Sequence, residues 1–380
     1  MAASYDVIVI GLGAMGSAAV YQLAARGRRV LGIDMFPLGH NHGSSHGDHR
    51  MIRRSAGRAV YLPLAARAFD AWRALEGESG YDILTILGEI GVRDPRLHVD
   101  GPVFGDDPTL GGMLELLDAR QLAERFPGVR LGDRMIATYE AEAGIVRPEV
   151  AVRAQLEMAE RRGATIRRPE EVVGWAVDGD GVRVETTRDR YAADRLIVTP
   201  GPWAPELLGD LNPPLEVVRI VNGYFTPARP DWWTAERGAP NFSLSVPEGH
   251  YYGMPAMAGL GLKIGRHDNG EPTTARTIRR DVDPAEVAAL GDVLDRYLPG
   301  ARGPVVKTIT CMYTNTPDAD FIVDRHPAHE QVVIGCGFSG TGFKFSCVIG
   351  EILADLALDG RTRYGIEDFS WRRFAGSAPG

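Results

Sequence analysis

The chain contains little cysteine, and its pattern argues against a secreted protein. The three cysteines, Cys311, Cys336 and Cys347, lie close together near the C-terminus. Small secreted domains instead carry an even number of cysteines as a disulfide framework. We therefore expect a reducing compartment and a cytoplasmic protein.

Lysine is also scarce, because only three of the 42 basic residues are lysines. A lysine within a motif is therefore informative. The formal net charge is -8, and no run of about five or six basic residues occurs. Binding to a polyphosphate backbone requires a cationic surface, so we expect no nucleic-acid partner.

Long apolar runs are missing as well. No segment approaches the about 18 uninterrupted apolar residues of a membrane-spanning helix. The first apolar run starts at Tyr5, and neither a basic flank nor a small-residue cleavage site accompanies it. We therefore expect no membrane partner.

The length and average composition indicate a globular protein with two domains. The chain has 380 residues, of which 44% are hydrophobic and 24% are charged. A single hydrophobic core stops growing at about 250 to 300 residues. The composition is that of an ordinary folded, water-soluble protein.

The N-terminus reads as a strand, a helix and a second strand. Residues 5–10 are apolar and rich in β-branched side chains, which is typical of a strand buried on both faces of a parallel sheet. Residues 14–26 follow a helical pattern that ends at Gly27. Residues 30–33 predict the second strand, which ends at Asp34.

Three glycines between the first strand and the helix match the dinucleotide fingerprint. Gly11 allows the tight turn, Gly13 lets the backbone approach a pyrophosphate, and Gly16 lets helix and strand pack closely. The helix N-terminus then favours the anion. Asp34 can accept hydrogen bonds from ribose hydroxyls and would repel a 2′-phosphate, which disfavours NADP.

A second match to this glycine spacing, at Gly335, Gly337 and Gly340, lacks the rest of the required context. It lies between a predicted strand at residues 332–334 and a predicted helix at residues 343–358, but no strand with a closing acid follows. We therefore predict a single dinucleotide site and no built-in NAD(P)H reductase half. This helix N-terminus can instead face the pyrimidine end of an isoalloxazine.

The rest of the chain alternates between helix, strand and irregular patterns. Residues 37–49 form a long irregular segment, and such loops are usually functional or disordered. A helix is predicted over residues 62–76. The middle of the chain is richer in strands, predicted at residues 182–186, 196–199, 217–225 and 251–255, with a proline-rich loop at residues 226–240.

Six segments spread over the chain resemble one family of flavoenzymes, the monomeric sarcosine oxidases and N-methyltryptophan oxidases. They are YDVIVIGLGAMGSAA at the N-terminus, GSSHGDHRMIR at 43–53, YYGMP at 251–255, LKIGRH at 262–267, CMYTNTPD at 311–318 and GFSGTGFKFS at 337–346. The resemblance extends from Tyr5 to about Phe369. It implies an FAD-dependent amine oxidase that oxidises an N-methyl amino acid, after which O2 reoxidises the flavin and yields H2O2.

The resemblance implies an α/β fold with a Rossmann-like FAD-binding domain and a second, mixed-sheet α+β substrate domain. We expect the discontinuous FAD-binding domain to comprise residues 1–85, 145–215 and 320–380. The substrate domain is then formed by residues 86–144 and 216–319. We also expect a monomer.

Cys311 matches the family's cysteine that links to the flavin 8α carbon. A thiolate is a suitable nucleophile for such a link. From the residues alone, a free cysteine is more often a small buried hydrophobe. The resemblance therefore carries the prediction of covalent FAD at Cys311.

The resemblance also implies the roles of charged residues. Arg53 and Lys344 match the clamp that holds the substrate carboxylate, a task suited to a guanidinium fork and a point charge. Lys263 matches the lysine beside flavin N5, whose charge stabilises developing superoxide. Arg50 and His267 complete the implied catalytic residues.

Further matches fall on cofactor-binding and substrate-binding positions. Ser44, His46, Arg50, Gly340 and Lys344 join the glycine fingerprint, Asp34 and Cys311 as expected cofactor contacts. Tyr252, Tyr313 and His267 match residues around the substrate pocket.

Four departures from the family leave the side-chain preference for the substrate open. Ser45 and His49 stand where better-known members carry His and Thr. Thr341 replaces a His, and Arg266 replaces Tyr or Lys. The implied reaction type does not depend on these positions.

Two other features receive structural interpretations. Four histidines lie within residues 40–49, but no helical H-E-x-x-H or cysteine pair accompanies them, so we predict a polar loop over the cofactor and no metal site. Trp232 and Trp233 are interpreted as packing or lid residues.

The favoured function is oxidation of sarcosine, with O2 and water, to glycine, formaldehyde and H2O2. Oxidation of a cyclic imino acid such as L-proline or L-pipecolate, or of N-methyltryptophan, is a related alternative. Alternatives of a different class are an NAD-dependent dehydrogenase and a non-catalytic flavin-binding subunit.

Overall fold

A computed structural model describes residues 4–55, 58–97, 111–132, 134–209 and 211–374. Within them, β1 (Ser4–Ile10) lies in the middle of an eight-stranded sheet with the order β10-β11-β12-β1-β2-β9; β20 pairs with β12, and β19 with β20. The parallel strands are β1, β2 (Val30–Ile33), β9 (Thr165–Arg167), β12 (Arg190–Val198) and β20 (His329–Cys336). Antiparallel edges are added by β10 (Val172–Asp178), β11 (Gly181–Thr186) and β19 (Ile322–His326).

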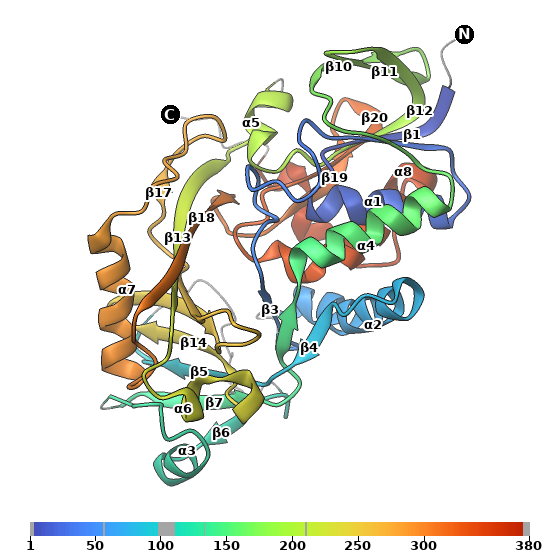
Figure 1. The fold of residues 1–380 in the computed structure, drawn as a ribbon. Coiled ribbons are helices and arrows are strands. Elements are labelled where there is room, and N and C mark those ends of the chain that lie inside the picture. The colour runs from blue at the N-terminus through green and yellow to red at the C-terminus, as the bar shows by residue number, and fades with distance from the viewer. Residues whose placement is uncertain (1–3, 56–57, 98–110, 133, 210, 375–380) are drawn as a thin grey trace.

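The side chains of β1 alternate between two hydrophobic cores. Val7 and Val9 join the core formed with helices on one face, whereas Ile8 and Ile10 join the core on the other face. The helices of the first core are α1 (Ala14–Ala25), α2 (Leu62–Ser79), α4 (Pro148–Arg161) and α8 (Ser346–Asp359), and α1, α4 and α8 lie side by side in Figure 1. A strand buried on both faces explains the continuous apolar run.

A second sheet of nine strands forms the other large part of the molecule. Its order is β17-β13-β16-β15-β14-β5-β7-β6, and β18 pairs with β13. The strands are β5 (Glu89–Arg93), β6 (Glu115–Leu117), β7 (Ile136–Glu140), β13 (Glu216–Phe225), β14 (Asn241–Val246), β15 (Gly249–Met254), β16 (Leu262–Arg266), β17 (Glu271–Pro272) and β18 (Val305–Asn315). All pairs are antiparallel except β14 with β5, so the sheet is mixed.

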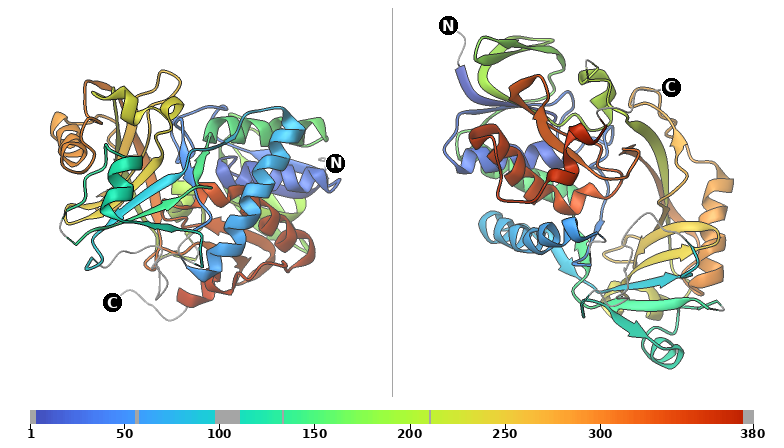
Figure 2. Two further views of the ribbon diagram at one scale, coloured as in Figure 1. Left: turned by 90° about the horizontal axis from the view of Figure 1, so that it is seen from below. Right: turned by 180° about the vertical axis from the view of Figure 1, so that it is seen from behind.

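Short helices accompany this second sheet, which stands beside the helices of the parallel sheet in all three views of Figures 1 and 2. The helix α7 (Pro284–Tyr297) packs on β13 and β16. The short helices α3 (Ala119–Arg125) and α6 (Pro230–Trp233) also belong to this part, whereas α5 (Ala204–Leu207) follows β12 and packs in the core of the parallel sheet.

A small three-stranded sheet lies between the two large ones in Figure 1. It consists of β3 (Arg50–Ile52), β8 (Gly144–Val146) and β4 (Leu84–Ile86), with β8 in the middle. The irregular segment predicted at residues 37–49 leads directly into β3 and contains neither helix nor strand. The segment therefore starts just after β2 of the large parallel sheet and ends at β3 of the small sheet.

The predicted fold class, an α/β part with a mixed second sheet, is confirmed, and most predicted elements are found within a few residues. One helix boundary was wrong: residues 342–345 form a 3-10 turn, and α8 begins only at Ser346. The strand predicted at residues 196–199 is the end of the longer β12, whose first half alternates between exposed and buried residues. That half pairs antiparallel with β11 near the edge of the sheet, so it shows no continuous apolar run.

Candidate functional site

The glycine fingerprint folds into a turn that excludes a larger residue at Gly11 and Gly16. Gly11 has φ +85°, and a Cβ there would lie 2.4 Å from the Thr199 carbonyl oxygen. A Cβ on Gly16 would lie 1.7 Å from the Gly11 carbonyl oxygen. The turn therefore packs closely against Thr199, at the end of β12, and against the first turn of α1, as the motif requires.

Asp34 is held firmly at the end of β2. One of its carboxylate oxygens accepts a hydrogen bond from the Leu12 amide at 2.7 Å, and the other accepts one from the Phe36 amide at 2.9 Å. A carboxylate has about four lone-pair sites, so acceptor capacity remains for ribose hydroxyls.

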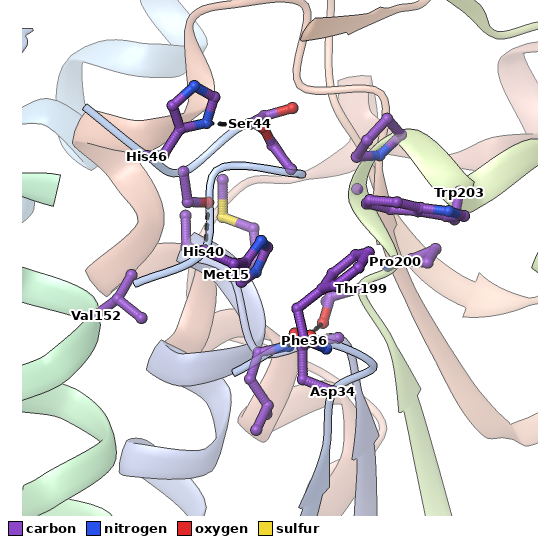
Figure 3. A pocket seen from close by; sticks show the side chains of 18 of the residues that line it. Met15, Asp34, Phe36, His40, Ser44, His46, Val152, Thr199, Pro200 and Trp203 are labelled. Atoms are coloured by element: carbon purple, nitrogen blue, oxygen red, sulfur yellow. Dashed lines mark hydrogen bonds between the residues drawn. The ribbon is translucent and has the colours of Figure 1, made fainter. Parts of the chain in front are cut away.

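These residues line one end of a long cavity. Its wall runs from Gly11, Gly13 and Asp34 past the 43–46 loop to Arg50, Cys311, Tyr313 and Gly340. Figure 3 shows Asp34 and Thr199 near one end of this cavity, and Ser44 and His46 near the other. The dinucleotide motif and the reactive-cysteine candidate therefore share one cavity.

Ser45 completes the N-terminus of α1. Its hydroxyl oxygen accepts a hydrogen bond from the Ala14 amide at 2.9 Å, and a Cβ on Gly13 would lie 3.0 Å from that oxygen. The sequence identified Ser45 only as a departure from the family. Its capping contact connects residues 31 positions apart, which no local pattern reveals.

His46 joins the loop to the strand that carries Cys311. Its two ring nitrogens lie 2.9 Å from the carbonyl oxygens of Gly43 and Thr310. Burial, followed by the charge of Arg50, lowers the pKa of His46 to about 4. The ring is therefore neutral near pH 7 and donates to one of the two carbonyls.

The Arg50 guanidinium is held by backbone carbonyls of the same loop. It donates to the oxygens of His46 at 2.7 Å, Ser44 at 3.1 Å and His49 at 3.1 Å. Its charge lies at the cavity wall, 6.0 Å from the centre of the Phe343 ring. Arg50 thus supplies positive charge to this part of the cavity.

Cys311 is buried on β18, opposite Ile220 of β13. Its Sγ atom lies 3.7 Å from the Ser44 carbonyl oxygen and borders the cavity. The other two cysteines are buried elsewhere, and burial raises the pKa of Cys336 to about 12. Only Cys311 is therefore placed to react with a group in the cavity.

Lys263 is 4% exposed and points from β16 toward the same loop. Its Nζ atom donates to the His49 carbonyl oxygen at 3.2 Å. Burial, followed by the nearby charge of Arg50, lowers the pKa of Lys263 to about 7. The side chain therefore exchanges between ammonium and amine near neutral pH.

Arg53 and Lys344 form a cationic pair with a carboxylate that the sequence did not reveal. Arg53 donates to Glu89 at 2.9 Å, and the Ser243 hydroxyl donates to the same oxygen at 2.7 Å. Burial, followed by Arg53, lowers the pKa of Lys344 to about 7. The other Glu89 oxygen is buried and has no hydrogen-bond partner within the described part of the chain.

Three aromatic residues form a group that includes Tyr313 of the cavity wall and His267, on which the charges of Lys344 and Arg53 act. Tyr313 donates to the Tyr252 hydroxyl at 3.2 Å, and Tyr252 donates to the Asn222 side-chain oxygen at 2.8 Å. The His267 ring centre lies 5.3 Å from that of Tyr313. Burial, followed by Lys344, lowers the pKa of His267 to about 4, so its imidazole is neutral.

The predicted residues thus fall into two adjoining groups. Gly11, Gly13, Asp34, Ser44, His46, Arg50, Cys311, Tyr313 and Gly340 line the long cavity. Gly16 supports the turn from beneath. The lining does not include Arg53, Tyr252, Lys263, His267 and Lys344. Tyr252 and His267 contact Tyr313 of the lining. Lys263 binds the His49 carbonyl, and the charges of Arg53 and Lys344 act on His267. A Cβ on Gly340 would lie 2.4 Å from the Tyr313 ring, which explains a glycine there.

Two further interpretations can be compared with the structure. Phe36 stacks on His42 with ring centres 4.4 Å apart and lies 4.8 Å from His40. No group of three or more metal-ligating side chains occurs among the described residues. Trp233 is buried and donates to the Pro299 carbonyl at 3.0 Å, so its packing role is confirmed.

None of the helices in the described ranges is both long and apolar enough to cross a membrane.

A family model and relatives with known activities match this chain along most of its length. The model described as FAD dependent oxidoreductase matches residues 6–356. The chain is 41% identical to a monomeric sarcosine oxidase of Streptomyces avermitilis, with 99% of each chain covered. It is 34% identical to an N-methyl-L-tryptophan oxidase of Escherichia coli, with 97% of this chain and 99% of that protein covered.

A solved structure supports the same fold. NikD, described as an unusual amino acid oxidase essential for nikkomycin biosynthesis, superposes with a TM-score of 0.84 at 26% identity, covering 97% of each chain.

Proposed function

Because the chain belongs to the FAD-dependent oxidoreductase family, alongside monomeric sarcosine oxidases and N-methyl-L-tryptophan oxidases, we propose that it oxidises an N-methyl amino acid, sarcosine first. The observation that carries this proposal is the cationic pair Arg53 and Lys344. Both charges act on His267, whose ring lies 5.3 Å from that of Tyr313 in the wall of the cavity that contains Cys311. Two cations suit a substrate with one carboxylate.

The cavity residues fit FAD. The glycine turn and α1 favour its pyrophosphate, Asp34 accepts from its ribose, and Arg50 supplies positive charge near the other end. Cys311 provides a sulfur for a thioether link to the flavin ring. When bound, FAD supplies a two-electron acceptor for the C–H next to the substrate nitrogen and passes those electrons to O2.

The protein side chains orient the substrate and manage its charge. Arg53 and Lys344 hold the carboxylate, while Tyr252 and Tyr313, whose hydroxyls are linked at 3.2 Å, form a wall beside the amine. Neutral His267 offers a ring nitrogen as a proton acceptor. Lys263 supplies positive charge where O2 is reduced.

Product analysis on a substrate panel tests the function. The purified protein is supplied with sarcosine, N-methyltryptophan, proline, pipecolate or dimethylglycine, and H2O2 and formaldehyde are measured. We expect both products from sarcosine in equal amounts. Peroxide without formaldehyde from proline or pipecolate, with no reaction of sarcosine, would overturn the N-methyl assignment. NAD-dependent turnover by a colourless protein would contradict flavin chemistry altogether.

Acid precipitation tests the proposed link through Cys311. We expect a yellow pellet from the parent protein and a colourless pellet with free FAD from Cys311→Ser. Cys336→Ser serves as the matched control, because that thiol is buried away from the cavity. A colourless pellet from the parent protein would refute covalent attachment.

We further propose a cytoplasmic monomer with the domain division 1–85, 145–215 and 320–380 against 86–144 and 216–319. The name of the Streptomyces relative supports the monomer. Light scattering of the purified holoenzyme at several concentrations tests it, and a mass near twice 41.3 kDa would contradict it.

A further inference from the structure

A row of three polar side chains crosses the second sheet at the level of Lys263. Lys263 on β16 is directly opposite Tyr224 on β13, and Tyr224 is directly opposite Lys307 on β18. Directly paired residues of neighbouring strands project from the same face of a sheet. The row therefore leads from a buried amine across two strands to a second amine.

Both lysines of the row bind the dipeptide Asp48–His49 of the 37–49 loop. The Nζ atom of Lys263 donates to the His49 carbonyl at 3.2 Å, and the Nζ atom of Lys307 pairs with the Asp48 carboxylate at 2.7 Å. The Tyr224 ring lies between them, 6.0 Å and 4.6 Å from the two Nζ atoms. These residues form one connected polar cluster.

Tyr224 has no evident structural reason for its hydroxyl. The residue is 1% exposed, and its buried oxygen makes no hydrogen bond of ordinary length within the described ranges, although the Asp48 carboxylate is close enough to interact with it. A buried polar group without a partner costs free energy, so an isosteric phenylalanine would be the more stable choice. Burial raises the pKa of Tyr224, and the neighbouring Asp48 carboxylate raises it further.

Exposure increases along the cluster. Lys263 is 4% exposed, whereas the side chains of Asp48 and Lys307 are 24% and 34% exposed. Asp48 and His49 line a second cavity, together with Arg147 and Glu149. The cluster therefore connects the buried amine with the second cavity.

Reduction of O2 creates a need for such a connection. The substrate supplies two electrons, and O2 takes up these electrons and two protons to form H2O2. An ammonium on Lys263 can give one proton to the reduced oxygen, which leaves a neutral amine in a buried position. Each turnover then requires one proton from solvent at this nitrogen.

We propose that Tyr224, Asp48 and Lys307 return a proton from the second cavity to Lys263. The proposal rests on the proposed function, in which Lys263 faces O2. A proton enters at Asp48 or Lys307, passes the Tyr224 hydroxyl and reaches the Nζ atom of Lys263, so one N–H bond forms for each one lost. The three residues act through Lys263 and are therefore positioning residues.

The charges around Lys263 are consistent with this role. Burial lowers its pKa to about 7, Arg50 and Lys307 lower it, and Cys311 and Asp48 raise it. Tyr252 lies beside it, with its ring centre 5.7 Å from Nζ, and His49 is neutral because burial lowers its pKa to about 4. Near neutral pH the amine therefore both gains and loses a proton readily.

Stopped-flow reoxidation of the holoenzyme tests the proposal independently of its substrate. The enzyme is reduced with dithionite under anaerobic conditions and mixed with O2 at about pH 6 and about pH 9, on either side of the Lys263 pKa of about 7. At the lower pH the proton is already in place, so Tyr224→Phe reoxidises like the parent. At the higher pH we expect a rate at least about tenfold lower, with a larger solvent isotope effect.

Two further variants, together with Tyr224→Phe, define the route. Asp48→Asn and Lys307→Met are expected to slow reoxidation at the higher pH, and added imidazole is expected to restore part of the rate. Tyr251→Phe is the matched control. Tyr251 lies on β15, next to Tyr252, and its hydroxyl donates to the Glu248 carbonyl oxygen. Parent-like rates in all three route variants, or slowing that is equal at both pH values and not rescued, would overturn the proposal.

The scarcity of lysine gives a second readout that does not depend on activity. Reductive ¹³C-methylation followed by NMR titration resolves each of the three lysines. We expect Asp48→Asn to lower the pKa of Lys263, because an anion is lost, and Tyr224→Phe to leave it unchanged. An equal shift of the Lys263 pKa in both variants would mean that Tyr224 affects the charge of Lys263 and moves no proton.

If dithionite-reduced enzyme reacts with O2 but sarcosine never bleaches the flavin, the proposed function fails, whereas the test of the proton route remains valid.

Discussion

The pairing of Arg53 with Glu89 limits the positive charge available to a substrate. Arg53 and Lys344 together carry two charges, and the Glu89 carboxylate cancels one of them at 2.9 Å. Glu89 also raises the pKa of Lys344 and, in addition to burial, that of Glu140. A substrate carboxylate therefore competes with an internal one for Arg53.

Replacing Glu89 tests this competition. Glu89→Gln keeps the shape of the side chain and removes its charge. At about pH 6, below the Lys344 pKa of about 7, the cationic pair then gains a net charge and holds a carboxylate more tightly. We expect the KM for sarcosine to fall several-fold, with kcat changed less. Ser243→Ala, which removes only the second contact of the same oxygen, is the matched control. A rise in KM would show that Glu89 holds Arg53 in position instead of competing with the substrate.

The pH dependence of substrate binding follows from Lys344. Its pKa of about 7 in the folded protein is below the ordinary 10.5, so the side chain is cationic below about pH 7 and neutral above it. The groups around it are Arg53, Glu89 and His267. We expect KM to rise as the pH increases through 7. Lys344→Met should raise KM by about tenfold or more at pH 6 and remove this pH dependence, while flavin stays attached. An unchanged KM would remove Lys344 from the clamp.

Candidate site residues could be predicted where a short motif contains them, and their roles stay predictions. Cys311, Lys263 and Arg53 each lie in a segment that resembles the family. Cys311 lines the long cavity, Lys263 binds the His49 carbonyl, and Arg53 pairs with Glu89. Asn222, Glu89 and Ser45 were missed, because their contacts join positions far apart in the sequence. A single sequence contains no signal for which strand is paired with which.

The strand–turn–helix unit at the N-terminus was predictable because its constraints are local. The apolar run, the glycine spacing and the closing Asp34 fall within one short segment, and the observed β1, α1 and β2 match them closely. The small sheet of β3, β8 and β4 was not foreseen, because it joins three short strands from distant segments. Short strands without alternating patterns give too weak a periodicity in the sequence to be predicted as strands.

Substitution of Gly16 tests the close contact in this unit. A Cβ at this position would lie 1.7 Å from the Gly11 carbonyl oxygen, so the backbone must move. We expect Gly16→Ala to destabilise the protein by about 3 kcal/mol or more and to lower its FAD content, measured by denaturant unfolding and by the flavin-to-protein absorbance ratio.

Gly77→Ala is the matched control within a helix. Gly77 lies in α2, and a Cβ there has no heavy atom within 4 Å. Alanine in an open helical position should stabilise the protein by about 0.5 to 1 kcal/mol, with unchanged flavin content. Equal behaviour of the two variants would contradict the assigned role of Gly16.

The 37–49 loop connects the two large parts of the molecule. Thr310 and Lys307 of β18 contact it through His46 and Asp48, and Arg280 contacts it from the segment before α7. The loop itself starts after β2 of the parallel sheet and ends at β3. The two-part fold class was predictable from the alternation of patterns along the chain. The contacts between the second sheet and this loop were not predictable, because they connect residues more than 200 positions apart in the sequence.

Arg280 is the contact that we expect to retain the cofactor. Its guanidinium donates to the carbonyl oxygens of Asn41 at 2.8 Å and His42 at 2.9 Å. These two residues directly follow His40, which lines the cavity together with Phe36. Arg280→Met removes both bonds from a loop that covers the cavity. In a Cys311→Ser background, where FAD is held without a covalent link, the release rate of FAD should increase several-fold, as followed by the recovery of flavin fluorescence.

Arg276→Met provides the control at the scale of the whole molecule. Arg276 also bridges the two parts, through ion pairs with Glu206 and Glu171, but its side chain is more than half exposed and does not touch the loop. Exposed ion pairs contribute little to stability, so its loss should leave the FAD release rate unchanged. If both variants accelerate release equally, the general association of the two parts retains FAD. If only Arg280→Met does so, the loop itself is the retaining element, because the remaining contacts between the parts are the same in both proteins.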